Sequence, residues 1–114
     1  MARKYPEDDL QMAAARYLDL IGAKWFHVAN ERKTTRQAGQ RLKKKGVKSG
    51  IPDIIILDQK KGFTGLVIEL KIKGNYTTEN QKKWLKTFKG LNYMAVVAYN
   101  MDEVIDVVNN YFSI

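Results

Sequence analysis

The sequence lacks several residue types that support common kinds of chemistry. None of its 114 residues is cysteine, which excludes disulfides, thiolate zinc sites and cysteine nucleophiles. No apolar run approaches the roughly 18 residues of a membrane span, so no membrane partner is expected. Residues 1–10 contain no apolar stretch of the secretory-signal type. These absences together favour a cytoplasmic domain without covalent cross-links.

Acidic residues are also scarce relative to basic ones. The chain has 12 aspartates and glutamates against 20 lysines and arginines, a net charge of +8. Such an excess attracts polyanions, of which nucleic acid is the commonest, although a merely well-solvated basic protein would also show it. Residues 30–50 contribute +7 and show no apolar period, which predicts a loop that contacts DNA phosphates or, alternatively, a disordered basic loop. The candidate DNA-binding residues in this segment are Arg32, Lys33, Arg36, Arg41, Lys43, Lys44, Lys45 and Lys48.

The apolar pattern outside that segment predicts one α/β domain covering residues 1–114. The predicted helices are 7–21, 78–89 and 101–113, and the predicted strands are 25–29, 51–58, 64–73 and 93–99. A short turn at 59–62 indicates a hairpin between the second and third strands. The strand-helix-strand passage from 64 to 99 indicates a parallel crossover. The expected fold is therefore a mixed central sheet flanked by helices, with an extra C-terminal helix.

Two acids and a lysine are predicted to meet on adjacent strands. Asp53 opens the second strand, and Glu69 and Lys71 lie on the third, where a period of two places them on one face. A hairpin around 59–62 would bring Asp53 to the same end as Glu69. Either motif alone is usually a turn or a solvated strand face, but the two together at this spacing indicate a site.

A divalent cation would explain why like charges gather on a covered sheet face. Unpaired buried charge is costly, and Mg²⁺ accepts carboxylate and carbonyl oxygens while it keeps several waters. Asp53, Glu69 and the backbone carbonyl of Leu70 are the candidate ligands. Lys71 would hold the attacking water or help to deprotonate it.

Two further polar residues are candidates for the same site. Glu7 borders the apolar stripe of the first helix and is a possible metal ligand, the alternative being a first-turn acid that stabilises the helix dipole. Gln81 borders the stripe of the second predicted helix. It is either a polar contact in the active site or the last residue of a Thr78-x-x-Gln81 capping box.

With these residues in place, the chain resembles the VRR-NUC family, a compact branch of the PD-(D/E)xK nuclease superfamily. Residues 49–53 (SGIPD) resemble its G-x-PD segment, residues 68–71 (IELK) its (I/V)E-x-K strand, and residues 78–81 (TENQ) its helix entry that ends in glutamine. The resemblance covers about residues 5–99, and the predicted order of elements matches the αβββαβ core of restriction-endonuclease-like folds. The basic segment 31–48 is longer than in the shortest family members.

The resemblance implies an Mg²⁺- or Mn²⁺-dependent endonuclease that acts on DNA. Carried over residue by residue, it makes Asp53 and Glu69 metal ligands, Lys71 the catalytic lysine, Glu7 the helix carboxylate and Gln81 the supporting residue. Stand-alone, phage-type members resemble Holliday-junction resolvases that act as homodimers on branched DNA, in the cytoplasm of a bacterial host. The alternatives are a nicking or restriction-like endonuclease on duplex DNA and a non-catalytic basic nucleic-acid-binding module.

Overall fold

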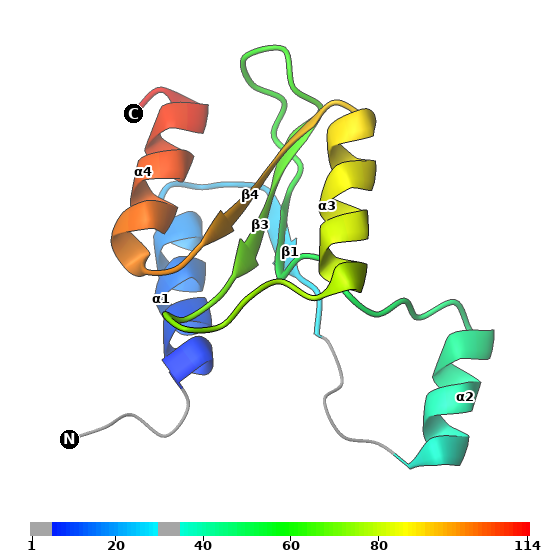
Figure 1. The fold of residues 1–114 in the computed structure, drawn as a ribbon. Coiled ribbons are helices and arrows are strands. Elements are labelled where there is room, and N and C mark those ends of the chain that lie inside the picture. Colours follow the sequence, from blue (N-terminus) through cyan, green and yellow to red (C-terminus); the bar gives the residue numbers. More distant parts are fainter. Residues whose placement is uncertain (1–5, 30–34) are drawn as a thin grey trace.

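The structure of the protein is a computed structural model that describes residues 6–29 and 35–114. Its elements run in the order α1 (Pro6–Leu20), β1 (Trp25–His27), α2 (Arg36–Lys44), β2 (Ile54–Ile56), β3 (Gly65–Leu70), α3 (Glu79–Gly90), β4 (Tyr93–Ala98) and α4 (Met101–Phe112). Figure 1 shows a central sheet with α1 and α4 on one side, α3 on the other, and α2 projecting from the body. None of the helices in these ranges is long and apolar enough to cross a membrane.

The sheet has the strand order β1-β2-β3-β4. β1, β2 and β3 pair antiparallel, and β4 adds in parallel to β3. The β2–β3 register places Ile54 opposite Ile68, so the hairpin brings the start of β2 next to the end of β3. The predicted mixed sheet, hairpin and parallel crossover are therefore confirmed.

β3 is buried along its whole length. Its side chains alternate between the two faces of the sheet and so belong to two separate hydrophobic clusters. Leu66, Ile68 and Leu70 belong to the larger cluster, which includes the apolar stripes of α1 and α4. Val67 packs on the other face in a smaller cluster with Leu85 and Phe88 of α3. Glu69 follows Val67 on this face, so its carboxylate lies under α3 instead of facing solvent.

The prediction that residues 30–50 contain no regular element is wrong for the described part, because residues 36–44 form α2. Thr35 caps the helix by accepting a hydrogen bond from the Ala38 backbone nitrogen (3.0 Å). The apolar residues of α2 are too few to show a helical period, because no residue of this helix is buried. A helix that covers no core needs only a sparse apolar stripe.

Three predicted strands were too long. β2 covers only residues 54–56, β3 ends at Leu70 and not at 73, and β1 covers 25–27. At β3, the Lys71 backbone nitrogen still bonds to the Ala98 carbonyl (2.9 Å), but the chain then turns, with Asn75 bonded to the Ile72 carbonyl (3.1 Å). Lys71 therefore lies just beyond the strand on which it was predicted.

Candidate active site

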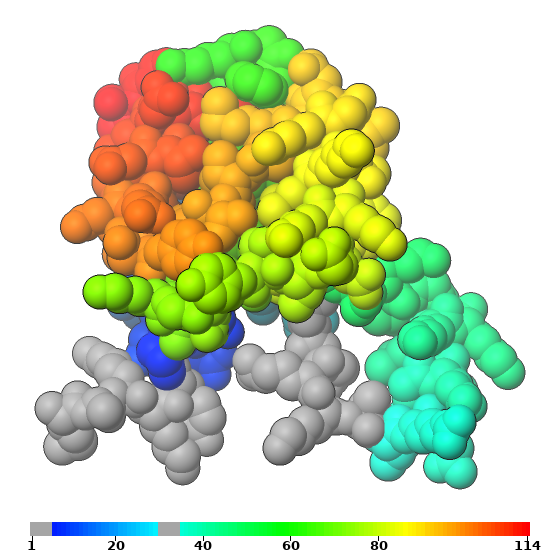
Figure 2. Space-filling model, viewed as in Figure 1, coloured from blue at the N-terminus to red at the C-terminus, as the bar shows by residue number. Residues whose placement is uncertain are grey.

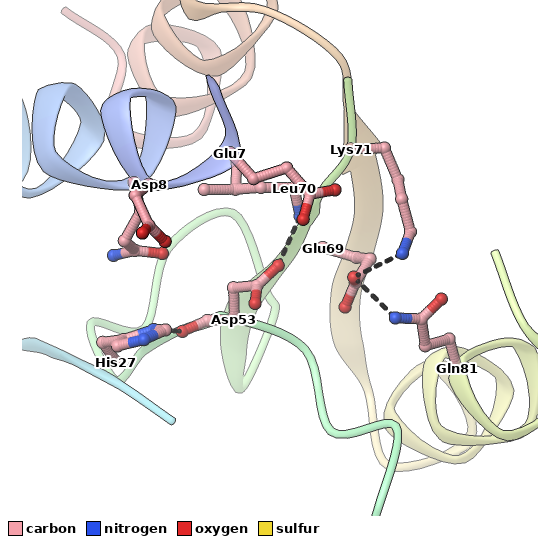
Figure 3. Close-up of a pocket in the computed structure, with 9 residues that line it drawn as sticks. Glu7, Asp8, His27, Asp53, Glu69, Leu70, Lys71 and Gln81 are labelled. Carbon is pink, nitrogen blue, oxygen red and sulfur yellow. Dashed lines mark hydrogen bonds and ion pairs between the residues drawn. The ribbon is translucent and has the colours of Figure 1, made fainter. Parts of the chain in front are cut away.

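A pocket of about 210 Å³ opens where the start of β2 meets the end of β3 (Figure 3). Its walls come from α1, β1, the segment before β2, the end of β3, and the first turn of α3. The lining residues are Glu7, Asp8, Gln11, His27, Asp53, Glu69, Leu70, Lys71 and Gln81. The six residues predicted to form a metal and catalytic site (Glu7, Asp53, Glu69, Leu70, Lys71 and Gln81) are all among them.

The segment before β2 is held tightly in place. Gly50 has φ +85°, and a Cβ there would lie 2.7 Å from the Asn80 carbonyl carbon, so only glycine allows this approach to α3. At the other end of the segment, the Asp53 carbonyl accepts hydrogen bonds from the Val28 nitrogen (3.0 Å) and from His27 Nδ1 (2.7 Å). The main chain at Asp53 is thus fixed between α3 and β1.

Pro52 leaves a backbone carbonyl available at the site. Extending the β2–β3 register by two residues from the Ile54–Ile68 pair places Pro52 opposite Leu70. Proline has no N–H to donate to the Leu70 carbonyl, so the hydrogen-bonded ladder cannot continue here. The Leu70 nitrogen bonds instead to Asp53 Oδ2 (2.7 Å). A carboxylate and a carbonyl oxygen therefore meet at the end of the strand pair.

Glu69 is the one buried charged or polar side chain in the described core, with 3% exposure. Its Oε2 accepts a hydrogen bond from Gln81 Nε2 (3.0 Å) and lies 3.5 Å from Lys71 Nζ. Gln81 is fixed in turn, because its Oε1 accepts from the Thr78 nitrogen (2.8 Å) in a capping box. Gln81 thus forms the capping box and also contacts Glu69, and the cap orients the Gln81 amide toward this acid.

The two acids hold protons more tightly than ordinary carboxyls. Burial, followed by the charge of Asp53, raises the pKa of Glu69 to about 8, against the partly compensating Lys71. Burial also raises the pKa of Asp53, although the Leu70 N–H opposes this. At neutral pH the pair therefore retains a proton in the absence of a cation.

The first helix contributes a polar wall that the apolar pattern only hinted at. Glu7 reaches the pocket from the first turn of α1, with Asp8 beside it (Figure 3). Gln11, one turn later, also lines the pocket, and its Oε1 is buried without a hydrogen-bond partner in the described part of the chain. An unsatisfied buried acceptor is costly, which indicates that the pocket takes a donor or a cation.

The sequence reasoning missed His27. A lone histidine on a strand is usually structural, but His27 lines the pocket, and its Nδ1 must carry the proton because a carbonyl can only accept. This leaves Nε2 as an acceptor in the neutral ring. The antiparallel pairing of β1 with the start of β2 was the signal that could have identified it.

The donor set fits a hard divalent cation. Two carboxylates, the Leu70 carbonyl and the unsatisfied Gln11 oxygen are oxygen ligands of the kind that Mg²⁺ prefers. Within residues 6–29 and 35–114, no three His, Cys, Asp or Glu side chains form a ready metal cluster. The set is thus suited to an ion that keeps part of its water shell.

Six of the eight predicted DNA-binding residues are described by the structure, and none of these six lines the pocket. Arg32 and Lys33 fall outside the described residues. The others are exposed on α2 and the segment after it, namely Arg36, Arg41, Lys43, Lys44, Lys45 and Lys48.

Comparison with known proteins places the chain in a defined family. The VRR-NUC domain model matches residues 4–102. A solved structure described as "VRR_NUC domain protein" is 29% identical, with a TM-score of 0.82, and the match covers 98% of this chain and 92% of that one. A second, described as "VRR_NUC domain", shares the fold at 16% identity and a TM-score of 0.65, with 92% and 96% covered. No curated protein matches the chain.

The family match covers every element that builds the pocket, from Glu7 on α1 to Gln81 on α3. The fold agrees with the nuclease-like α/β core expected from the motifs around Asp53 and Glu69. The chain belongs to the VRR-NUC family, whose domain has a nuclease-type function with DNA as the substrate.

Proposed function

We propose that the protein is a metal-dependent endodeoxyribonuclease that hydrolyses DNA phosphodiester bonds with Mg²⁺ or Mn²⁺. The observation that carries the proposal is the convergence of Asp53, Glu69 and Lys71 in one pocket beside the Leu70 carbonyl. Two carboxylates alone would repel a phosphate, so the arrangement makes sense for a nuclease only with a bridging cation.

Each residue of the pocket would have a role that follows from its position. Asp53, Glu69 and the Leu70 carbonyl would hold the cation, with Glu7 as a possible further ligand on the α1 side. A bound divalent ion would stabilise the negative charge that develops on the phosphate. Lys71, whose Nζ lies 3.5 Å from Glu69, would hold the attacking water, and its positive charge would help that water to lose its proton to solvent. Gln81 is a positioning residue, because it fixes Glu69 through a hydrogen bond.

The preferred substrate under this proposal is branched DNA, including the four-way junction. A pocket of about 210 Å³ accepts a single phosphodiester, so each copy of the chain cuts one strand. Resolution of a junction needs two symmetric cuts, which a homodimer with a twofold axis provides. The products would carry a 5′ phosphate and a 3′ hydroxyl.

The test is cleavage of supercoiled plasmid and a synthetic four-way junction in Mg²⁺, compared with EDTA and with Lys71→Ala. Cleavage is expected only for the wild-type protein with metal. Equal cleavage in all three conditions would refute the proposal. Comparing the junction with its component linear duplexes separates junction resolution from a nicking or restriction-like activity.

A non-catalytic binding module is the alternative from another class, and the basic surface of α2 favours it. It predicts metal-independent, salt-sensitive DNA binding that is unchanged by Asp53→Ala or Glu69→Ala, and no cleavage. The buried Glu69 argues against it, because a polyanion binder gains nothing from a desolvated acid.

A further inference from the structure

A second concave site lies between α2 and the first turn of α3, with a volume of about 680 Å³. We propose that this groove holds an unpaired nucleotide of the DNA strand being cut, next to the scissile phosphate. The inference rests on the proposed function and names the feature of the substrate that the enzyme selects.

The floor of the groove is apolar and rigid. Leu42 is half-buried and Val47 is 50% exposed, and both line it. The Val47 nitrogen bonds to the Leu42 carbonyl (3.0 Å) and the Gly46 nitrogen to the Lys43 carbonyl (3.0 Å). This is a Schellman cap, a motif in which the two flanking side chains frequently pack together. Val47 nevertheless stays 50% exposed and lines the groove.

The rim of the groove is strongly basic. Residues 35–50 carry six lysines and arginines and no acid, and Lys43 and Lys48 line the groove directly. The one acid in its lining, Glu79, lies 3.5 Å from Lys82 Nζ. In Figure 2 residues 35–50, which we call the α2 arm, project from the body below α3. The charge favours a polyanion over a second copy of this basic chain.

The groove adjoins the pocket that holds Glu69. Gln81 lines both cavities, so they share this side chain as a wall. The Asn80 amide donates to Ser49 Oγ (2.7 Å), and Gly50 packs against the same turn of α3. The wall between the two sites is therefore fixed, and Gln81, which borders the groove, also bonds to Glu69.

The apolar floor decides which kind of nucleotide fits. A duplex buries its base faces in the stack and presents phosphates and base edges. An apolar floor gains most from contact with a base face, which only an unpaired nucleotide offers. The lysines on the rim would neutralise its flanking phosphates. Among branched DNAs, the groove thus favours those with an unpaired position beside the cut over a junction whose bases are all paired.

The experiment measures binding of a fluorescent single-stranded oligonucleotide and a blunt duplex in EDTA. Val47→Phe adds a stacking surface and should tighten single-strand binding roughly tenfold, with duplex binding unchanged. Leu42→Thr and Val47→Thr together should weaken single-strand binding about three- to tenfold, with duplex binding within about twofold. Leu91→Thr, at a similarly exposed apolar position at the far end of α3, is the matched control.

The outcomes separate the two proposals. If Val47→Phe leaves single-strand binding unchanged, or alters both DNA forms equally, the groove assignment is wrong. If Val47→Phe changes the sedimentation of the protein alone, the groove is an interface between copies and the assignment is again wrong. A wild-type protein that cleaves no DNA in Mg²⁺, while Val47→Phe still discriminates the two forms, would refute the nuclease proposal and support the groove.

Discussion

The pocket that holds Asp53 and Glu69 and the α2 arm (residues 35–50) differ in almost every physical respect. The pocket is built from fixed groups: Asp53 bonded to Leu70, and Glu69 bonded to Gln81. The arm has no buried residue and carries six exposed cations between residues 35 and 50. The pocket concentrates charge where water is scarce, whereas the arm spreads charge where water is plentiful.

Under the proposed function, this difference separates chemistry from DNA binding within one small domain. Desolvated acids have a large effect on a reacting phosphate but cost stability unless neighbours hold them. Exposed lysines and arginines cost little and attract DNA over a distance, but they cannot orient a single bond. Substitutions in the two regions should therefore change different observables.

The largest effect is expected at Lys71. Lys71→Ala removes the ammonium beside Glu69 and should lower the cleavage rate about 10²- to 10⁴-fold. DNA affinity in EDTA should stay within about twofold of wild type, since the arm supplies most of the binding. Lys73→Ala, two residues later and exposed, is the matched control and should keep its activity. A parallel loss in both variants would mean that general charge, not position, determines the rate.

A smaller effect is expected at Gln81. Gln81→Leu removes the hydrogen bond to Glu69 and half of the capping box, so cleavage should fall about 10- to 100-fold. Thr78→Ala removes only the Thr78 hydroxyl from the cap and should cost about 1 kcal/mol of unfolding free energy, with a near-normal rate. Single-turnover rates and denaturant unfolding would be measured for both. Equal rate losses would show that Gln81 acts only through the helix cap.

The arm should alter binding without altering stability. Replacing Arg41, Lys44 and Lys45 with glutamine should weaken duplex binding. The slope of log affinity against log salt should become shallower by about 0.9 for each phosphate that the arm no longer neutralises. The unfolding free energy should change by less than about 0.5 kcal/mol, because these side chains are exposed. An unchanged salt slope would show that these three side chains do not neutralise DNA phosphates.

A last expected effect is a dependence of stability on pH. Folding raises the pKa of Glu69 from 4.5 to about 8, so between these values the folded state holds a proton that the unfolded state has released. The metal-free protein should therefore lose stability as pH rises through this range. Mg²⁺ should reverse the loss at high pH, and Glu69→Gln should flatten the metal-free profile. Thermal melts in EDTA and in Mg²⁺ would measure both.

Much of the catalytic pocket could be predicted from local patterns. The alternation around Glu69 predicted its face of the strand, and a hairpin turn predicted its closeness to Asp53. The Thr78-x-x-Gln81 spacing predicted the capping box, which the structure contains. The catalytic and metal roles of these residues remain predictions, which the Lys71 and Gln81 variants test.

The arm was less predictable for a physical reason. Helix recognition depends on an apolar stripe that packs against a core, and α2 packs against very little. His27 was also absent from the predicted site, because its part in the site depends on which strands become neighbours. No local spacing encodes that proximity.

Short-range patterns were enough to specify the order of the four strands and the alternation that buries Glu69. Each of these depends on residues close together along the chain. Packing in three dimensions was needed to place Pro52 opposite Leu70, to close α1, β1 and α3 around the two acids, and to set the groove beside their pocket. Such arrangements depend on segments distant in sequence, where hydrophobic burial acts without regard to direction.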